Sequence, residues 1–281
     1  MTKISQLFTI ALLSLRLFSS HAQDTLKTTG TQAVLYVGKG ENQPLIVGLG
    51  GSEGGNAWAS PHWKNTRDQF PEKGYAFLAI GYFGVKGAPK VLDKIAIEAI
   101  HDAIIEATKH PRINKMKIAI VGGSRGADLA LLIGSYYQDI KCVVGLMPSH
   151  AVFPGHTEHL SSSCWTFQNK ELAFVPVNEE AVPFLMKRDL RGAFETMLKD
   201  TLAEHKALIK VENINGPILL LSATDDEICP SAPMSEKIIA RLREKRFTYF
   251  NQHLAITGKH TEPLNHFDRV FTFLNTYFPA K

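Results

Sequence analysis

An excess of charge of one sign, blocks of like charge and repeats are all lacking in this sequence. Lys and Arg number 31 and Asp and Glu 27 among 281 residues, which gives a formal net charge of +4. This balance excludes the strongly basic surface of a typical nucleic-acid-binding protein, so we expect no nucleic acid as a partner. Hydrophobic residues make up 44% and charged residues 21% of the chain, a composition that excludes a disordered protein and is typical of a globular one.

Long apolar runs are also lacking, and the most apolar stretch lies near the N-terminus. Lys3 precedes an apolar segment at residues 7–13, and Ala22 ends a small-x-small tripeptide. This order is typical of a secretory signal peptide, so we expect residues 1–22 to be removed and residues 23–281 to form the folded domain. Because the run is too short to cross a bilayer, we expect no stable membrane span in the mature chain and a secreted or periplasmic location.

Cysteine is scarce, with Cys142, Cys164 and Cys229 alone in the whole chain. An odd number in an exported protein leaves at least one thiol free or paired between chains. Cys142 falls in an expected buried strand, which predicts an inert thiol. The spacing of Cys164 and Cys229 does not decide whether they form a disulfide.

Apolar segments typical of buried strands alternate with segments of helical spacing. Strands are predicted at 33–37, 44–49, 75–80, 117–121, 141–147, 217–222 and 247–251, and helices at 88–109, 126–137, 233–244 and 264–277. This alternation predicts an α/β fold with a mostly parallel sheet and helices on both of its faces. Residues from about 150 to 215 break the rhythm and contain no clean buried strand, which predicts a lid-like or substrate-binding insertion.

The most informative segment is the strand, turn and helix around Ser124. Gly122-Gly123-Ser124-Arg125-Gly126 follows an apolar strand, opens a helical pattern and matches the Gly-x-Ser-x-Gly nucleophile elbow. Glycines flank the serine because the turn is too tight for a Cβ, and the serine backbone is strained. The motif predicts that Ser124 is a nucleophile whose Oγ stands clear of the sheet, beside the free N–H groups of the next helix.

A serine hydroxyl is a poor nucleophile without a base and a group that orients the base. In an elbow-type fold the acid follows the next buried strand. Asp225 and Asp226 both stand after strand 217–222. Asp226 is favoured because similar loops place the acid four residues before a proline, here Pro230, but the choice between the two stays open.

The base of an elbow-type site follows the last strand. His260 lies in the glycine-bearing loop 257–263 between the last predicted strand and the last predicted helix, so it is favoured as the base. His253 would still be on or near the strand, and His266 would already be in the helix. Ser124, Asp226 and His260 then form the expected catalytic set.

Stabilisation of a tetrahedral oxyanion requires two N–H donors directed at the developing charge. The backbone N–H of Arg125 is the first candidate, and Gly51 or Ser52 in the glycine-rich loop 50–55 supplies the second. That loop lacks the Gly-Lys-Ser/Thr ending of a phosphate-binding loop.

A cluster of histidines after strand 141–147 suggests a metal site at first sight. His150, His156 and His159 occur there with Glu158, but their spacing matches no established set of metal ligands. We therefore expect neither a metal nor any other cofactor. His150 follows a strand at the edge of the sheet where pockets form, so we expect it to line the site.

Several segments together resemble the C-terminal catalytic domain of the acyl-CoA thioesterase / bile acid-CoA:amino acid N-acyltransferase (BAAT) family, within the α/β-hydrolase superfamily. The segments that carry the resemblance are residues 44–55, 73–79, 110–114, 211–226 and 258–263. The resemblance implies an α/β-hydrolase fold, and Ser124, Asp226 and His260 fall on the family's nucleophile, acid and base. Position 124 is serine, as in the hydrolytic members, whereas the transferase members have cysteine.

The sequence thus predicts an exported serine hydrolase that cleaves small-molecule acyl esters or thioesters through an acyl-enzyme intermediate. The export signal would separate the protein from the CoA pool, so a simpler ester or thioester is at least as well supported as acyl-CoA. Two alternatives remain: an acyltransferase that moves the acyl group to an amine or alcohol, and a non-catalytic binding protein. Four aromatic residues of the insertion are expected to line an acyl pocket or to form a small core: Trp165, Phe167, Phe184 and Phe194.

Overall fold

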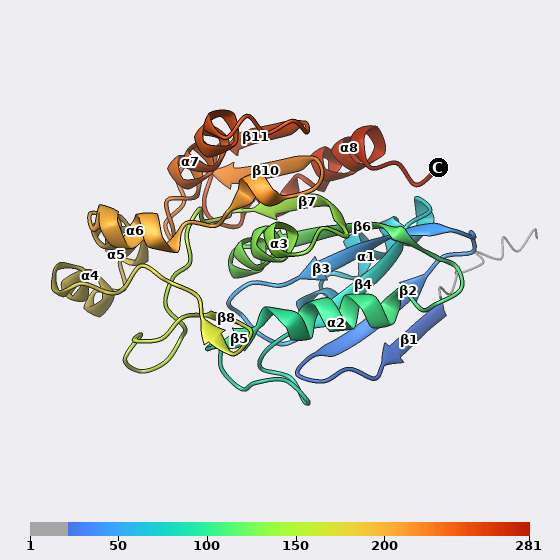
Figure 1. Ribbon diagram of the computed structural model, residues 1–281, viewed down its shortest axis with the longest axis horizontal. Coiled ribbons are helices and arrows are strands. Elements are labelled where there is room, and N and C mark those ends of the chain that lie inside the picture. The colour runs from blue at the N-terminus through green and yellow to red at the C-terminus, as the bar shows by residue number, and fades with distance from the viewer. Residues whose placement is uncertain (1–21) are drawn as a thin grey trace, which may run out of the picture.

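The computed structural model describes residues 22–281, and an eight-stranded sheet forms its centre (Figure 1). The strand order is β1-β2-β4-β3-β6-β7-β10-β11, in which β1 and β2 are antiparallel to their neighbours and all other pairs are parallel. The strands are β1 Ala22–Leu26, β2 Gln32–Val37, β3 Gln43–Leu49, β4 Ala76–Gly81, β6 Ile113–Gly123, β7 Ile140–Leu146, β10 Ile218–Ala223 and β11 Asn251–Ile256. The expected signal peptide lies outside the described residues, apart from Ala22.

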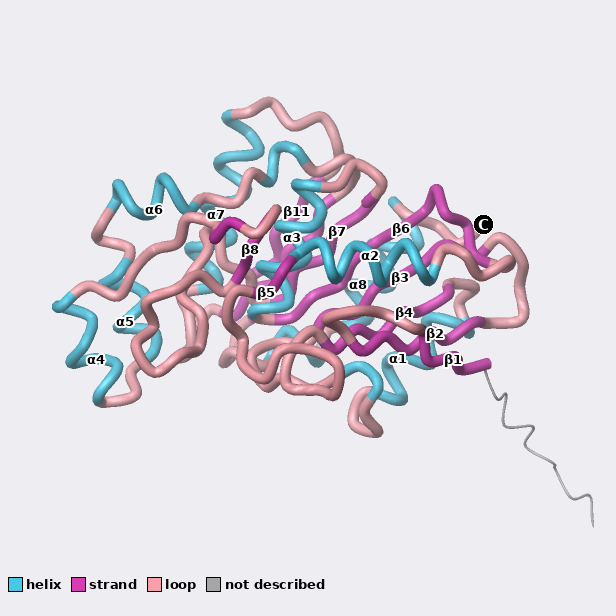
Figure 2. The backbone as a smooth tube through the Cα atoms, turned by 60° about the horizontal axis from the view of Figure 1, so that its bottom comes forward, coloured by secondary structure: helices cyan, strands magenta, loops and turns pink. Residues whose placement is uncertain are grey.

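Helices cover both faces of this sheet, as Figures 1 and 2 show. One face packs against α2 (Ile97–Ala107), α3 (Arg125–Tyr136) and α7 (Ser231–Glu244). The other packs against α1 (Lys64–Glu72) and α8 (Phe267–Tyr277). Every residue of the central strands β3 and β4 is buried, because a parallel sheet covered on both sides leaves neither face to water. The predicted α/β fold is therefore confirmed.

Residues 150–215, which we call the insertion, extend beyond the carboxyl ends of the strands (Figure 1). They hold two short strands, β8 (Trp165–Phe167), of which Trp165 alone is buried, and β9 (Lys170–Glu171), which is exposed. β8 pairs with β9 and with β5 (Ile95–Ala96) in a small second sheet. The pairing of β5 with β8 is long-range and leaves no periodic signal in either short segment. Trp165 is fully buried as a result.

The charged part of the insertion forms three short helices. They are α4 (Val182–Met186), α5 (Leu190–Met197) and α6 (Thr201–Ala207). Asp189 and Asp200 begin the second and third of these by accepting backbone N–H groups with their side chains. Short apolar side chains from these helices form a separate small core with Phe153.

Two predicted boundaries are wrong. The helix expected over 88–109 begins only at Ile97, because Lys94 has φ +50° and the two residues after it pair in β5. The strand expected at 247–251 lies at Asn251–Ile256 instead. Phe247 donates its N–H to the carbonyl of Leu242 and so closes α7, which removes it from the strand.

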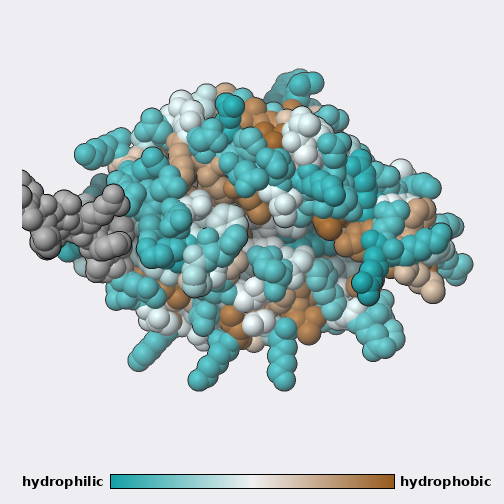
Figure 3. All heavy atoms as spheres, turned by 180° about the vertical axis from the view of Figure 1, so that it is seen from behind, coloured by the Kyte–Doolittle hydropathy of each residue, from teal (hydrophilic) through white to brown (hydrophobic). Residues whose placement is uncertain are grey.

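On the side opposite to that of Figure 1, hydrophilic side chains cover most of the molecule and small apolar patches lie between them (Figure 3). Within residues 22–281, no helix has both the length and the apolar character needed to cross a bilayer.

Candidate active site

Ser124 stands at the turn between β6 and α3, with φ +52° and ψ −121°. A non-glycine residue reaches this region only when its surroundings impose it. Here the Ser124 N–H donates to the carbonyl of Leu146 at 2.8 Å, and the helix starts at the next residue. The expected elbow geometry is present, with the serine side chain at the carboxyl edge of the sheet.

The glycines on either side of Ser124 permit close backbone approach. A Cβ at Gly122 would collide with the backbone of Gly126, and a Cβ at Gly126 would collide with the backbone of Gly50. At Gly123, by contrast, the nearest atom to an added Cβ is a leucine methyl group 3.9 Å away.

This contrast gives a prediction for stability. Gly122→Ala should lower the free energy of unfolding by about 3 kcal/mol or more, because backbone atoms must move apart to admit the methyl group. Gly123→Ala, at the next position in the same turn, should lower the free energy of unfolding much less. Urea unfolding followed by circular dichroism measures both, and equal losses for the two variants would contradict this account of the turn.

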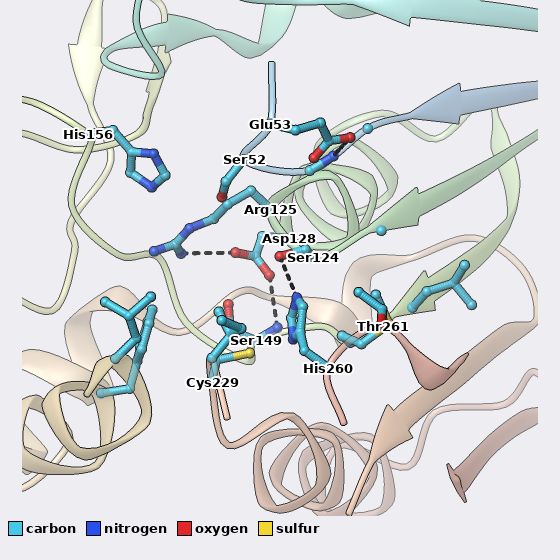
Figure 4. A pocket seen from close by; sticks show the side chains of 18 of the residues that line it. Ser52, Glu53, Ser124, Arg125, Asp128, Ser149, His156, Cys229, His260 and Thr261 are labelled. Atoms are coloured by element: carbon cyan, nitrogen blue, oxygen red, sulfur yellow. Dashed lines mark hydrogen bonds and ion pairs between the residues drawn. The ribbon is translucent and has the colours of Figure 1, made fainter. Parts of the chain in front are cut away.

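Ser124, His260 and Asp226 are brought together from three segments of the chain. Nε2 of His260 lies 3.1 Å from Oγ of Ser124 (Figure 4). Nδ1 of His260 lies 2.8 Å and 2.9 Å from the two carboxylate oxygens of Asp226. The imidazole thus links the hydroxyl to the carboxylate in the order that nucleophilic catalysis requires.

Asp226 is fully buried, and its carboxylate is held by several donors. It accepts backbone N–H groups from Ile228 and Cys229 and the hydroxyl of Ser231. Burial raises the pKa of the Asp226 carboxyl, but hydrogen bonds from His260 and Ser231 outweigh burial and bring this pKa below its ordinary value. Asp226 is therefore ionised at neutral pH and oriented towards the imidazole.

The other candidates for acid and base lie elsewhere. Asp225 is exposed, and its carboxylate accepts a hydrogen bond from the neighbouring Thr224 hydroxyl. His253 lies on β11 with Nε2 2.6 Å from the hydroxyl of Ser222, and Nε2 of His266 lies 3.3 Å from a carboxylate oxygen of Glu262. The geometry favours Asp226 and His260, as the sequence had suggested.

Backbone N–H groups of Arg125 and of the loop 50–55 lie next to Ser124. The N–H of Arg125 and that of Ser52 have no hydrogen-bond partner among residues 22–281. A Cβ at Gly51 would lie 3.1 Å from Cβ of Ser124, so this loop packs directly against Ser124. The Gly51 N–H, however, donates to Oε1 of Glu53 at 3.0 Å, a contact that the sequence analysis did not anticipate.

A cavity of about 690 Å³ opens above Ser124, between the sheet edge and the insertion. Of the four aromatic residues expected to line it, only Phe194 does so. Trp165 belongs to the core, Phe167 packs on Tyr136 and Phe184 lies outside the lining. The sequence analysis missed several side chains that line the cavity, which are Trp58, His62, Trp63 and Leu264.

A buried ion pair lies beside Ser124. Nη1 of Arg125 lies 3.2 Å from Oδ2 of Asp128, whose other oxygen accepts the backbone N–H of Ser149 at 2.8 Å (Figure 4). Burial raises the pKa of the Asp128 carboxyl, and Arg125 lowers it by less. His156 also lines the cavity, and burial together with the nearby Arg125 lowers its pKa to about 4, so its ring is neutral at pH 7.

His150 does not line the main cavity, contrary to the prediction. It lines a smaller one of about 250 Å³, where its Nε2 lies 2.5 Å from a carboxylate oxygen of Glu204 on α6. Burial lowers the pKa of His150 more than the hydrogen bond to Glu204 raises it. This contact ties the first residue of the insertion to α6.

The three cysteines are free and buried, so the chain holds no disulfide between Cys164 and Cys229. Within residues 22–281, one group of metal-ligand types has its donor atoms within 4.8 Å of one another: Asp226, Cys229 and His260. Asp226 and His260 already form a hydrogen bond with each other. Burial and the Asp226 carboxylate raise the pKa of the Cys229 thiol well above its ordinary value, which disfavours the thiolate that a metal would bind.

A family model and two relatives point to the same family of acyl-CoA thioesterases and N-acyltransferases. The model of the family described as BAAT / Acyl-CoA thioester hydrolase C terminal matches residues 95–263. Acyl-coenzyme A thioesterase 6 of Mus musculus is 26% identical over 202 residues, which cover 69% of this chain and 43% of the relative. Acyl-coenzyme A amino acid N-acyltransferase 1 of Mus musculus is 24% identical over 60% of this chain and 38% of the relative. The chain therefore spans less than half the length of these curated relatives.

Solved structures with the same fold cover almost the whole chain. Esterase Pf2001 of Pyrococcus furiosus superposes with a TM-score of 0.62 at 15% identity, over 92% of both chains. The α/β hydrolase GrgF of Penicillium sp. sh18 superposes with a TM-score of 0.60 at 15% identity, over 92% of this chain and 99% of that one. At this level of identity the similarity establishes the α/β-hydrolase fold.

Proposed function

The chain belongs to the BAAT / acyl-CoA thioester hydrolase C-terminal family, and from that premise we propose that it is an exported serine hydrolase of acyl esters or thioesters. One observation carries the proposal. The hydroxyl of Ser124, the imidazole of His260 and the carboxylate of Asp226 lie in continuous hydrogen-bond contact, at 3.1 Å and 2.8 Å, at the floor of a cavity.

In the proposed reaction, Nε2 of His260 takes the proton of the Ser124 hydroxyl while Oγ attacks the substrate carbonyl carbon. The carbonyl oxygen becomes an oxyanion, which accepts the N–H of Arg125 and a second N–H from the loop 50–55. The imidazolium, stabilised by Asp226, gives its proton to the departing alcohol or thiol. Water then attacks the acyl-enzyme with the same base and releases the carboxylic acid and the free Ser124 hydroxyl.

The second oxyanion donor is either Ser52 or Gly51. In the structure the Ser52 N–H is unpartnered among the described residues, whereas Gly51 donates to Glu53. A role for Gly51 would require the carboxylate of Glu53 to turn away when substrate binds. Ser52 requires no such movement, so we favour it as the donor.

The experiment that tests this function is labelling with a fluorophosphonate probe, which reacts with activated serines. The full chain should be labelled at Ser124, and an excess of p-nitrophenyl butyrate should protect it. Absence of labelling in the folded protein would favour the alternative of a non-catalytic binding protein. Product analysis with an added amine or alcohol separates hydrolysis from acyl transfer, and we expect the free acid as the main product.

The substrate is proposed to be a small acyl ester or thioester. The names of the curated relatives point to acyl-CoA, but the cavity lining gives little support for binding a polyanionic leaving group. Among residues 22–281, Arg125 is the one lysine or arginine that lines the cavity, and Asp128 already pairs with it. We therefore expect simple esters to be cleaved at least as well as the corresponding CoA thioesters.

Export is proposed from the sequence of residues 1–22. If the signal is cleaved after Ala22, the mature protein begins at Gln23. Expression in a Gram-negative host, followed by mass spectrometry of the periplasmic fraction, should give a chain that starts at this residue. Full-length protein found solely in the cytoplasm would contradict the proposal.

A further inference from the structure

The side chain of Arg125 extends from the start of α3 into the main cavity, beside the nucleophile (Figure 4). It is only 9% exposed. Besides the ion pair with Asp128, its guanidinium carbon lies 5.4 Å from the ring centroids of both Phe153 and Phe194. Two aromatic rings and one carboxylate thus hold the cation in a fixed place at the insertion side of the site.

The hydrogen-bonding capacity of this guanidinium is mostly unused. Arginine has five N–H groups, and they cannot be lost by deprotonation. Among residues 22–281, its one hydrogen bond is the donation from Nη1 to Asp128. The imidazole of His156, which also lines the cavity, likewise has no hydrogen-bond partner among these residues. Donors without a protein partner therefore border the space where a substrate would lie.

A plain alkyl chain would cover these donors without replacing their hydrogen bonds to water. Any ligand that lacks a hydrogen-bond acceptor leaves these donors unpaired and binds less tightly for that reason. A site with such donors therefore discriminates between ligands with and without an acceptor more strongly than an apolar wall does. The remaining wall on this side is apolar, with Leu185, Leu190 and Met197. The site thus combines an apolar surface with one fixed group of donors.

We propose that Arg125 is a specificity-determining residue that selects substrates whose acyl group carries a neutral oxygen acceptor, such as a ketone, ester or amide carbonyl. This inference rests on the proposed hydrolase function. The acceptor oxygen would receive N–H groups from the free edge of the guanidinium while the scissile carbonyl lies at Ser124. The backbone N–H of the same residue serves the oxyanion, so one residue contacts both oxygens.

The charges around the cavity favour a neutral acceptor over a carboxylate. Asp128 already compensates the charge of Arg125, and Glu53 adds a further carboxylate to the lining. A bound carboxylate would be a third acidic group facing a single lysine or arginine side chain. We therefore expect an acyl group that ends in a carboxylate to be a poorer substrate than its oxo analogue.

The test compares p-nitrophenyl heptanoate with its oxo analogues, which carry one ketone at successive positions along the chain, and with the p-nitrophenyl half-ester of pimelic acid. For the full chain, we expect kcat/KM of the best oxo ester to exceed that of the heptanoate by about tenfold. We expect the half-ester to be slower than that oxo ester. A heptanoate that is hydrolysed as fast as every oxo ester, or a half-ester that is the fastest, would overturn the proposal.

Two variants separate specificity from a structural role. Arg125→Met removes the donors, and the double variant R125M/D128N also avoids leaving an unpaired buried carboxylate. In either variant the preference for the oxo ester should disappear, whereas Arg125→Lys, which keeps a donor, should retain part of it. Equal losses for both esters would mean that Arg125 only supports the fold.

The experiment also distinguishes this inference from the proposed function. Fluorophosphonate labelling of Ser124 in the same samples reports whether the site is assembled and reactive. If Ser124 is labelled and all esters are hydrolysed at the same rate, the proposed hydrolase function is supported and the role of Arg125 is overturned. If the samples show no labelling and no hydrolysis, the proposed hydrolase function and the role of Arg125 are both overturned.

Discussion

Ser124→Ala is expected to reduce kcat/KM for p-nitrophenyl butyrate by a factor between about 10⁴ and 10⁶. The alanine removes the only atom that forms the acyl-enzyme bond. His260 and the N–H groups around the site remain, so substrate binding and a small residual rate from oxyanion stabilisation should persist. KM should therefore change far less than kcat.

Ser135→Ala is the matched control for this variant. Ser135 lies on α3, the helix that follows Ser124, is buried, and donates its hydroxyl to the carbonyl of Leu132. Its loss should leave kcat close to that of the parent. A Ser124→Ala protein that hydrolyses the ester as fast as the Ser135→Ala protein would show that another group is the nucleophile.

The second large effect is expected for Asp226→Asn, which should lower kcat by roughly ten-thousandfold. The carboxylate accepts from Nδ1 of His260 and leaves Nε2 free to take a proton. An amide can present its NH₂ group to Nδ1 instead, which stabilises the wrong tautomer. It also cannot stabilise the imidazolium that forms during attack.

Asp225→Asn provides the comparison, because this neighbouring residue is exposed and makes no contact with the imidazole. We expect its kcat to stay within about twofold of the parent, as for most surface substitutions. Thermal unfolding of Asp226→Asn must be recorded as well, since Asp226 also holds the loop through Cys229 and Ser231. A larger loss for Asp225→Asn than for Asp226→Asn would reverse the assignment of the acid.

The catalytic candidates could be predicted because each follows a strand whose apolar sequence marks it plainly. Ser124 carries a local motif, and Asp226 and His260 follow from chain order along the sheet. Their convergence required only that parallel strands end at one edge. The choice between Asp225 and Asp226 depends on which side chain points inwards, and a sequence pattern does not contain that direction.

The lining of the cavity could not be predicted in the same way. Trp58 and Trp63 line the cavity because a short helix and a loop follow β3, far from Ser124 in the chain. The expected lining residue Trp165 is instead held in the core by the pairing of β8 with β5. Such contacts between distant short segments give no periodic signal, and three of the four aromatics named from the sequence lie outside the cavity lining.

The side chain of Arg125 shows a further limit of sequence analysis. Its position after the nucleophile predicted a role for its backbone N–H alone. The ion pair with Asp128 one turn along α3 follows from helical spacing, but the rings of Phe153 and Phe194 come from the insertion. The specificity that we propose for Arg125 therefore depends on the folded insertion as well as on the motif.

Trapping of the acyl-enzyme tests the central claim most directly. Trypsin cleaves after Lys117 and Arg125 and releases the peptide Ile118–Arg125, in which Ser124 carries the single hydroxyl group. After rapid acid quenching of a reaction with p-nitrophenyl butyrate, mass spectrometry should find this peptide with one added butyryl group, and the adduct should vanish as the substrate is exhausted. A butyryl group that accumulates on another peptide during turnover, while Ile118–Arg125 remains unmodified, would contradict the account.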